Sequence, residues 1–446
     1  MGDPVALVVT LDTIGDKMLS EKRRTSTVFG ISQAVLPDSY IDRGALDESL
    51  SKLLKRPTHV ALCGASKCGK SWLRQRTVSA AIIIQCRLGR GVHDLYVDAL
   101  SQLGVKLVLN DTQSGKISGH VKAEASIGEG LIAKVLGGMA TAKAGIEGER
   151  GTETQSGPVG HDVNDLRFVA DLLKASGRRL VIEDFHYLSV TERKKFAFDL
   201  KALWDYGLFV IIVGVWSQSN MLIYLNPDLS GRIEEIPIYW SDDDLKKVLR
   251  KGGDALNLQF TDEFTSACVK NCYGNVGILQ ALTLKALDHL RIEESSWNQM
   301  TVSSLDALHT AALLYADQLN PLYQQFAKRV SKGIRTRQDS TGIYGYAMAV
   351  ILDAPDDLAL TSISLDYIFE QAHSREPRIQ KANLRTVLEK FEQLQVDDEG
   401  RSLVLAYNDA VGEITIVDRQ LLLYRRYCTV KWPWEDLIAD AKAGTS

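Results

Sequence analysis

Residues Gly64-Ala65-Ser66-Lys67-Cys68-Gly69-Lys70-Ser71 match the pattern GxxxxGK(S/T) in full. The apolar run His59–Cys63 comes before them and suits a buried strand, and the residues from Trp72 onward can open a helix. A strand, a glycine-rich turn and a helix N-terminus in this order form the context of a phosphate-binding loop, where backbone N–H groups surround phosphate oxygens. The motif therefore predicts a site for a nucleoside triphosphate.

The side chains of this loop have separate expected roles. Lys70 would reach the β- and γ-phosphates, and the hydroxyl of Ser71 would be a ligand of Mg²⁺. The residues expected to hold the nucleotide here are Gly64, Ser66, Lys67, Cys68, Gly69, Lys70, Ser71 and Trp72.

The composition is in the ordinary range of soluble proteins. The chain has 446 residues, 45% hydrophobic and 24% charged, and this length allows about three domains with at least one large core. The net charge of −4 argues against a general polyanion binder, so any contact with nucleic acid needs a local basic patch.

The cysteines and the apolar runs indicate the compartment. Two of the six cysteines, Cys63 and Cys68, lie in or beside the phosphate loop, which is a poor place for a structural disulfide. Cys268 and Cys272 lack a second pair of nearby ligands, so we interpret them as thiols rather than a zinc site. No apolar run approaches the roughly 20 residues that span a bilayer. We expect a cytoplasmic protein without membrane contact.

Apolar β-rich runs alternate with helical patterns in the first half of the chain. The runs cover residues 59–63, 81–86, 179–182 and 209–215, with a helical pattern at 94–103. This alternation predicts an α/β fold with a parallel sheet covered by helices.

The glycine-rich segment 111–160 interrupts the alternation. Period-two patterns at 120–125 and 140–147 flank the apolar residues 131–136 and predict an inserted β-hairpin. Two interpretations remain open: a mobile surface insertion, or an arm that contacts a neighbouring subunit or a substrate.

Helical patterns dominate the rest of the chain. They cover residues 245–258, 262–290 and 305–334. Basic residues gather around the end of the last one, at Lys328, Arg329, Lys332, Arg335 and Arg337. Three further helices, at 344–352, 365–372 and 380–394, precede two alternating strands, 402–407 and 413–417, around the turn residues 408–412. Three helices and a hairpin predict a winged-helix domain.

A phosphate loop needs acidic residues elsewhere to hold Mg²⁺ and to orient the attacking water. Glu183 and Asp184 follow the apolar run Leu180-Val181-Ile182 and meet this need. We expect Glu183 on the metal side and Asp184 as the catalytic acid; Asp184 is also suited to cap a helix. His186, just beyond, is either a polar relay or an ordinary histidine.

In the order of these motifs the chain resembles an AAA+ ATPase. The motifs are the phosphate loop, the acid pair, the strand 209–214 followed by Trp216-Ser217-Gln218, and Leu229-Ser230-Gly231-Arg232. The resemblance looks closest to the origin-recognition ATPases, transposon-encoded regulators and STAND-type switches. It implies ATP with Mg²⁺ as cofactors, a homo-oligomer with ATP between subunits, and a P-loop NTPase sheet with a helical lid followed by a winged helix.

The resemblance also implies domain boundaries and further site residues. The expected parts are an N-terminal segment (1–38), a nucleotide-binding core (39–235), a helical lid (236–304), a helical linker (305–340) and a winged-helix domain (341–446). Tyr40 and Arg43 would line the adenine pocket. Ser217, or alternatively Gln218, would be the sensor of the γ-phosphate. Arg232 would be an arginine finger reaching into the next subunit, unless it forms a surface salt bridge with Glu234 or Glu235.

Two departures from the family pattern affect the expected activity. The acid pair is Glu-Asp where Asp-Glu or Asp-Asp is usual, and the shorter Asp184 would hold the water-orienting oxygen back by about one carbon, which favours a slow switch over a fast motor. Residues 273–277 read YGNVG, where the family often has a Gly-Asn pair followed by a sensor arginine, and no arginine follows here.

The partner of the ATPase is open between two hypotheses. Arg378, Lys381 and Arg385 are spaced as on one helix face and would meet DNA phosphates, which predicts a DNA-binding regulator acting on a partner enzyme. The alternative is a signalling switch, for example in antiphage defence, whose winged helix and insertion contact an effector protein.

Overall fold

A five-stranded parallel sheet forms the nucleotide-binding core. The computed structural model describes residues 22–110, 118–123, 134–135, 164–216, 219–333, 341–395 and 403–443. The sheet has the order β2-β5-β6-β1-β7, and its strands are β1 (His59–Cys63), β2 (Ala81–Gln85), β5 (Arg179–Glu183), β6 (Ile211–Val213) and β7 (Ile233–Pro237). Every neighbouring pair is parallel, so the carboxyl ends of all five strands share one edge. The predicted α/β fold class is confirmed.

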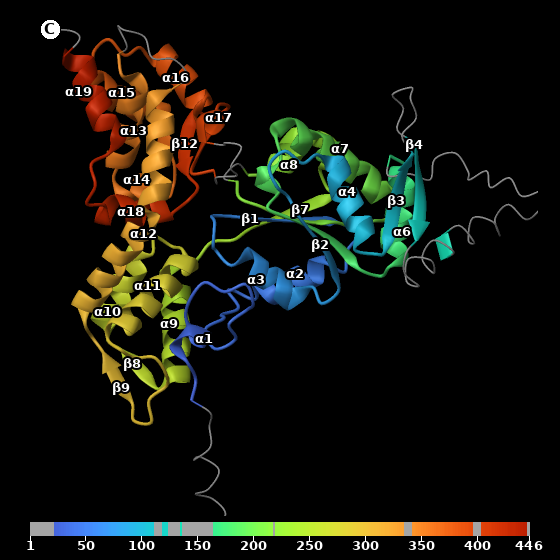
Figure 1. The fold of residues 1–446 in the computed structure, drawn as a ribbon, viewed down its shortest axis with the longest axis horizontal. Helices are drawn as coiled ribbons and strands as arrows, with labels where there is room; N and C mark the ends of the chain where they lie inside the picture. The colour runs from blue at the N-terminus through green and yellow to red at the C-terminus, as the bar shows by residue number, and fades with distance from the viewer. Residues whose placement is uncertain are drawn as a thin grey trace, which may run out of the picture.

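Helices cover both faces of this sheet (Figure 1). Alternate residues of one strand serve the two faces: Ala61 packs in the apolar cluster on one side and Leu62 in the cluster on the other. The first cluster lies under α4 (Val92–Ser101), α6 (Leu166–Ala175), α7 (Val190–Asp205) and α8 (Met221–Leu225). The second lies under α2 (Leu46–Leu53) and α3 (Lys70–Thr77). Short 3₁₀ turns occupy Phe185–Tyr187 and Pro227–Leu229.

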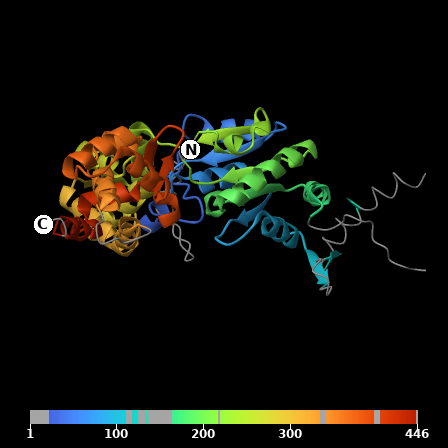
Figure 2. The ribbon, with the colours of Figure 1, turned by 90° about the horizontal axis from the view of Figure 1, so that it is seen from above.

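A hairpin extends the core at the end farthest from the C-terminus (Figures 1 and 2). It consists of β3 (Val105–Asn110) and β4 (Ser118–Ala123), paired antiparallel from Val105 opposite Ala123 to Asn110 opposite Ser118. The sequence predicts a hairpin between residues 120–125 and 140–147. The structure instead pairs the first of these segments with β3, and residues 140–147 lie outside the described part of the chain.

The helical lid follows the sheet and holds the start of the chain. Its elements are α9 (Asp242–Leu256), β8 (Leu258–Phe260), α10 (Asp262–Asn271), α11 (Val276–His289) and β9 (Met300–Val302). Helix α1 (Thr25–Val28) docks on it, because the Thr25 N–H donates to the Glu293 carbonyl at 2.9 Å and the ring of Phe29 is fully buried among lid residues. The described part of the N-terminal segment thus packs on the lid, and the boundary at residue 38 stays a prediction.

The helix after the lid is not an exposed linker. Helix α12 (Leu305–Lys332) buries Ala311, Tyr315 and Tyr323. These side chains belong to one apolar cluster that continues from Phe29 through the lid to Trp434 in the C-terminal domain (residues 341–446). The lid and the C-terminal domain consequently share a single core with α12 inside it, and both lie beside the sheet in Figure 2.

The C-terminal domain contains the predicted three helices and hairpin. Its helices are α13 (Ile343–Asp353), α14 (Asp356–Leu360), α15 (Leu365–Arg375), α16 (Lys381–Glu389), α17 (Phe391–Gln395), α18 (Gln420–Tyr427) and α19 (Pro433–Ala443). Strands β10 (Ile363–Ser364), β12 (Glu413–Ile416) and β11 (Leu405–Asn408) form an antiparallel sheet in that order. The predicted turn is present, with the Gly412 N–H donating to the Asn408 carbonyl at 2.8 Å and a φ of 75° at Gly412. The winged-helix assignment stays a prediction.

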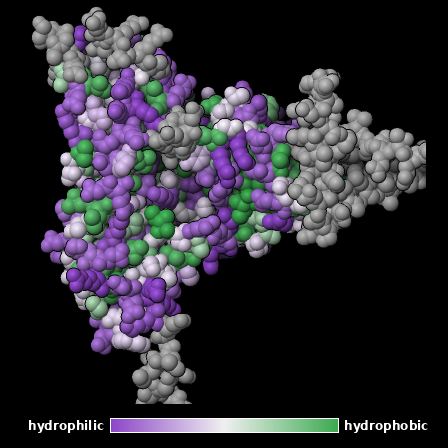
Figure 3. Space-filling model, viewed as in Figure 1, coloured by the Kyte–Doolittle hydropathy of each residue, from purple (hydrophilic) through white to green (hydrophobic). Residues whose placement is uncertain are grey.

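The outer surface in this view is mostly hydrophilic, with apolar residues in small groups (Figure 3). Within the described ranges, none of the helices combines the length and the apolar character that crossing a bilayer requires.

We expect Gly252→Ala to lower the stability of the fold although alanine is the better helix former. A Cβ atom at Gly252 on α9 would lie 2.2 Å from Cζ of the buried Phe29 ring, and such overpacking costs about 1–3 kcal/mol of the free energy of unfolding. Urea denaturation measures this loss, with the exposed Arg250→Ala on the same helix as control. Full stability of Gly252→Ala would contradict the docking of Phe29 on the lid.

Candidate functional site

A cavity of about 450 Å³ lies at the carboxyl edge of the sheet, in the size range of small-molecule sites. The phosphate loop forms one wall and the end of β5 another. The lid, the N-terminal segment and the C-terminal domain close it with Val276, Gly277 and Gln280, with residues 30–33, and with Leu403. All the residues predicted to hold the nucleotide from Ser66 to Trp72 line this cavity.

The phosphate loop has the strand-turn-helix geometry predicted from its sequence. It runs from β1 to α3, with φ values of 143° at Gly64, 60° at Lys67 and 90° at Gly69. A Cβ atom at Gly64 would lie 2.5 Å from the Ile238 carbonyl oxygen, so this position requires glycine. Gly69 occupies the N-cap of α3, whose free N–H groups and dipole favour an anion.

Side chains from other segments hold the carbonyls on the outside of the loop. The Cys68 carbonyl accepts from Arg43 Nη1 at 3.2 Å and from Trp240 Nε1 at 2.9 Å. The Ser66 carbonyl accepts from Asn275 Nδ2 at 2.7 Å. These bonds leave the N–H side of the loop facing the cavity.

Helix α11 of the lid approaches the same loop through a glycine. The Gly277 N–H donates to the Lys67 carbonyl at 3.2 Å, and a Cβ atom at Gly277 would lie 2.6 Å from Cβ of Lys67. Asn275 caps the helix by accepting from the N–H groups of Gly277 and Ile278. The glycine and asparagine of the 273–277 segment therefore position the lid on the loop, a role that the sequence does not reveal.

Lys70 is folded over the loop and buried. Its Nζ donates to the carbonyls of Gly64 at 3.0 Å and Ala65 at 2.6 Å, and only 9% of the residue is exposed. A phosphate oxygen is a stronger acceptor for an ammonium group than a carbonyl, because both partners are then charged. Lys70 is therefore placed to turn towards a phosphate in the cavity.

Glu183 is held by an arginine that the sequence analysis does not identify. Arg74 on α3 donates to Glu183 Oε1 from Nε at 3.0 Å and from Nη2 at 2.8 Å, and each residue is 7% exposed. Arg74 follows Lys70 by four residues, one helical turn, and this spacing is the only sequence signal that points to it. The carboxylate expected on the metal side thus has a resident positive partner.

The residues predicted to bind Mg²⁺ suit that ion in donor chemistry. Ser71 and Glu183 both line the cavity, and Glu183 Oε2 makes no hydrogen bond with any described residue. Mg²⁺ takes one or two protein oxygens together with phosphate oxygens and waters. One free carboxylate oxygen and one hydroxyl meet this requirement, with the charge of Glu183 already shared with Arg74.

Asp184 lies in the cavity wall beside Glu183. Its backbone is left-handed, with φ 56°, and its side chain makes no capping hydrogen bond to the 3₁₀ turn that follows. Burial, followed by the charge of Glu183, raises the pKa of the Asp184 carboxyl, while the charge of Lys70 opposes this. The side chain is therefore not used as a cap, and Asp184 is part of the cavity wall.

His186 also lines the cavity, and its imidazole is neutral. Burial lowers the pKa of His186 to about 3, and the positive charges of Lys70 and Arg193 add to the effect. Its Nδ1 atom is buried without a hydrogen-bond partner among the described residues. A neutral imidazole there can accept or donate one hydrogen bond but does not act as a titrating base at neutral pH.

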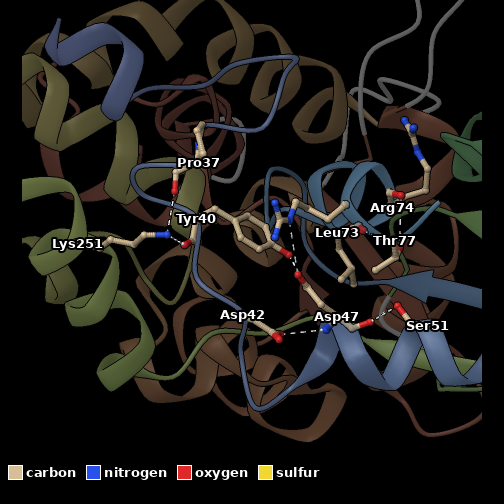
Figure 4. Close-up of polar contacts among 10 residues, drawn as sticks. Pro37, Tyr40, Asp42, Asp47, Ser51, Leu73, Arg74, Thr77 and Lys251 are labelled. Carbon is tan, nitrogen blue, oxygen red and sulfur yellow. Dashed lines mark hydrogen bonds and ion pairs between the residues drawn. The ribbon is translucent and has the colours of Figure 1, made fainter. Parts of the chain in front are cut away.

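The predicted adenine-pocket residues do not line the cavity. The Tyr40 hydroxyl donates to Asp47 and its ring lies under Arg76, on the side of α3 away from the Arg74 side chain (Figure 4). Arg43 stacks on the Trp240 ring with 4.0 Å to the ring centroid and supports the loop from behind. This prediction is therefore corrected for both residues.

Residues 30–33 of the N-terminal segment line the cavity, whereas Tyr40 and Arg43 do not. Trp72 Nε1 donates to the Ser32 carbonyl at 2.9 Å, and Gln75 Nε2 donates to the Gln33 carbonyl at 2.8 Å. Ile31, which lines the cavity, is 54% exposed, so an apolar side chain faces an open site. These residues are far from the phosphate loop in sequence, so the order of the motifs does not point to them.

The predicted sensor residues, Ser217 and Gln218, lie outside the described residues. Arg232 is described and lies where β7 begins, beside the start of β1, because its carbonyl accepts from the His59 N–H at 2.9 Å. The loop follows β1 at the opposite edge, about 16 Å away at 3.3 Å per residue. The Arg232 guanidinium lies over the Trp204 ring at 4.9 Å and donates to the Asp228 carbonyl. No ion pair with Glu234 or Glu235 is present among the described contacts, and the finger role stays a prediction.

The three residues predicted to bind DNA do not form the expected stripe. Arg378 precedes the N-cap of α16, so it does not share the helical spacing of Lys381 and Arg385. Each of the three pairs with an acid of the same domain: Arg378 with Glu376, Lys381 with Asp366 and Arg385 with Glu389.

The C-terminal domain contacts the phosphate loop directly. Lys67 Nζ donates to Gln420 Oε1 at 2.7 Å, across 353 positions of sequence. Gln420 is 4% exposed and also accepts from the Tyr315 hydroxyl of α12 at 2.7 Å. Burial lowers the pKa of Lys67, opposed by the charge of Asp418. The C-terminal domain thus forms part of the wall of the site.

Comparisons with known proteins give neighbours in fold. No protein-family model matches the chain, and no curated protein matches it either. The fold is similar to that of the Orc1 protein of Aeropyrum pernix in complex with DNA, with 11% identity, coverage of 90% of this chain and 95% of that one, and a TM-score of 0.40. It is also similar to the RuvB Holliday junction branch migration motor of Thermotoga maritima, with 13% identity, coverage of 86% and 93%, and a TM-score of 0.31.

These two similarities concern the fold alone. Since their TM-scores are 0.40 or lower, no ligand, reaction or partner is taken from them. The parallel sheet, the phosphate loop at its carboxyl edge and the helical lid give this chain a P-loop fold.

Proposed function

We propose that this chain is an ATP-binding and ATP-hydrolysing switch whose C-terminal domain responds to the occupancy of the phosphate loop. The observation that carries the proposal is the single cavity shared by the loop lysine Lys70, the acid pair Glu183 and Asp184, and residues of the lid and C-terminal domain. Phosphate-binding, water-orienting and mobile parts have to meet in one place for a nucleotide to act as a switch.

The roles within the site follow from position. The N-termini of α3 and α11 and the Lys70 ammonium favour the phosphates, and Ser71 with Glu183 Oε2 would hold Mg²⁺. Asp184 would orient the attacking water. The base would lie against Ile31 and Val276, whose apolar side chains line the far wall.

Slow turnover is part of the proposal. Asp184 is one carbon shorter than the glutamate usual at this position, so its carboxylate would lie farther from the attacking water. A weakly placed water-orienting carboxylate suits a long-lived ATP state.

The C-terminal domain is proposed to be a winged helix that transmits this state. A triphosphate on the loop competes with Gln420 for the Lys67 ammonium, because a charged phosphate oxygen is the stronger acceptor. We further propose that the chain forms homo-oligomers in which Arg232 acts on the ATP of the neighbouring subunit. For this, Arg232 has to leave its contacts with Trp204 and Asp228.

Duplex DNA is the partner we propose, through Lys381 and Arg385. Their side chains are 50% and 52% exposed, and ion pairs at such exposure contribute about 0–1 kcal/mol, so DNA phosphates can replace the acids. Arg378 is less available, since Glu376 holds it through two hydrogen bonds.

The alternative is a signalling or antiphage-defence ATPase whose C-terminal domain and insertion bind an effector protein. One observation favours it: all three basic residues have acidic partners, so this face carries little net positive charge. ATP-dependent assembly without retention on DNA would support it.

We expect Lys70→Ala to lose ATP binding by at least about tenfold, because the ammonium that meets the phosphates is gone. Asp184→Asn should bind ATP at least as tightly as the parent, because a negative group is removed from the cavity wall, and should lose turnover. Calorimetry and phosphate release measure the two effects, with Lys174→Ala on the surface of α6 as control. Hydrolysis by Asp184→Asn at the parent rate would contradict the water-orienting role.

We expect Gln420→Ala to increase the association rate of a fluorescent ATP analogue by about threefold to tenfold. The physical reason is that a hydrogen bond to a charged group stabilises by roughly 1.5–3 kcal/mol, and the ligand no longer has to break the one from Lys67. Stopped-flow fluorescence measures the rate. Gln324→Ala is the matched control, because Gln324 bonds Tyr424 between the same two helices away from the loop. Equal rates in both variants would refute the coupling.

We expect the double variant Lys381→Ala/Arg385→Ala to bind duplex DNA with a log-log salt slope smaller by about 2, corresponding to two lost phosphate contacts. Fluorescence anisotropy over a range of salt concentrations measures the slope, with Lys431→Ala as a surface control. An unchanged slope would exclude this face as the DNA contact.

A further inference from the structure

Arg74 and Glu183 form the most buried ion pair among the described residues. Their side chains are 9% and 10% exposed, and every other described pair has at least one side chain above these values. Both donors of Arg74 reach the same oxygen, Glu183 Oε1, at 3.0 Å and 2.8 Å. The pair lines the nucleotide cavity, so it is in reach of a ligand there.

The position of this pair is unusual for its chemistry. A dication is expected to be the cationic partner of the acid at the end of this strand, and here a guanidinium already neutralises it. Glu183 Oε2 and the Ser71 hydroxyl would still take Mg²⁺, so a metal ion would add to a charge that Arg74 already balances.

We propose that Arg74 supplies the positive charge that lets a nucleoside triphosphate bind this site largely without a divalent cation, which confines the need for Mg²⁺ to hydrolysis. This inference rests on the proposed nucleotide-binding function and adds a positioning residue to it. Arg74 fixes Glu183 through Oε1 and keeps its charge from repelling the incoming phosphates.

The electrostatics of the cavity support this assignment. The charged side chains in its wall are Lys67, Lys70, Arg74, Glu183 and Asp184. With Arg74 in place, the positive groups outnumber the negative ones, three to two. Without it, two ammonium groups face two carboxylates, and a polyanion would need an added cation to enter. Removing one partner of a buried pair leaves the other charge uncompensated, so Glu183 alone would attract a metal ion strongly.

The test measures nucleotide affinity with and without metal. A fluorescent, slowly hydrolysed ATP analogue is titrated into the full chain in EDTA and again in excess Mg²⁺. We expect the two dissociation constants of the wild type to agree within about threefold, and those of Arg74→Gln to differ by at least about tenfold, with weaker binding in EDTA.

Two further variants separate charge from structure. Arg74→Lys keeps the charge and should resemble the wild type in its metal dependence. Arg76→Gln removes an arginine from the same helix outside the cavity and should also behave as the wild type. As a second readout, titration of nucleotide-free protein with Mn²⁺ by electron paramagnetic resonance should show tighter binding to Arg74→Gln than to the wild type.

The outcomes distinguish this inference from the proposed function. Absence of nucleotide binding by the wild type in either buffer would overturn both. Wild-type binding that weakens tenfold or more in EDTA would overturn the role of Arg74 alone, and so would equal metal dependence in Arg74→Gln and the wild type. If Arg74→Gln does not fold, the wild-type comparison together with Arg74→Lys still decides.

Discussion

The conformation of the phosphate loop depends on hydrogen bonds from parts of the chain that are far from it in sequence. Arg43 and Trp240 hold the Cys68 carbonyl, and Asn275 holds the Ser66 carbonyl. A loop that presents N–H groups inward has to turn its carbonyls outward, and buried carbonyls need donors. The N-terminal segment, the connection from the sheet to the lid, and the lid itself provide these donors, so all three have to be in place before the loop can bind a phosphate.

This constraint explains why glycines and buried side chains occur where other segments contact the loop. Gly277 is a glycine because any side chain would collide with Lys67, and Gly64 is a glycine because Ile238 passes 2.5 Å from where a Cβ would lie. The stacking of Arg43 on Trp240 keeps a guanidinium group under the loop at 8% exposure, and burial lowers its pKa. The positive charge of the site therefore comes from behind the loop as well as from Lys70.

The parts that the sequence predicts are those encoded by local patterns. The motif at 64–71 with its flanking strand and helix, four strands of the sheet and the helices of the lid follow from period and turn chemistry, and all are present. The sequence does not predict strand β7, because Ile233–Pro237 contains two glutamates and lacks an apolar pattern. Its place beside β1 is set by strand pairing.

The site is less predictable than the fold. Arg74 looks like an ordinary helix-surface residue until the sheet brings Glu183 to it, across 109 positions. The contact of Lys67 with Gln420 spans most of the chain, and no local sequence pattern predicts it. For Tyr40 and Arg43 the sequence predicts a contact that the structure does not make. Their family-like position ahead of the first strand suggests a ligand contact, whereas Tyr40 bonds Asp47 and Arg43 bonds the Cys68 carbonyl.

The shared core limits how the molecule can respond to a ligand. Because α12 lies inside one apolar cluster with the lid and the C-terminal domain, these parts move as one body or their packing is lost. That body touches the loop at Asn275, Gly277 and Gln420, so a shift of the loop acts on all three contacts together. The connection between sheet and lid is the short stretch from Ile238 to Ser241, where Trp240 bonds the loop. A phosphate that displaces the Cys68 carbonyl would thus act directly on this connection between the sheet and the lid.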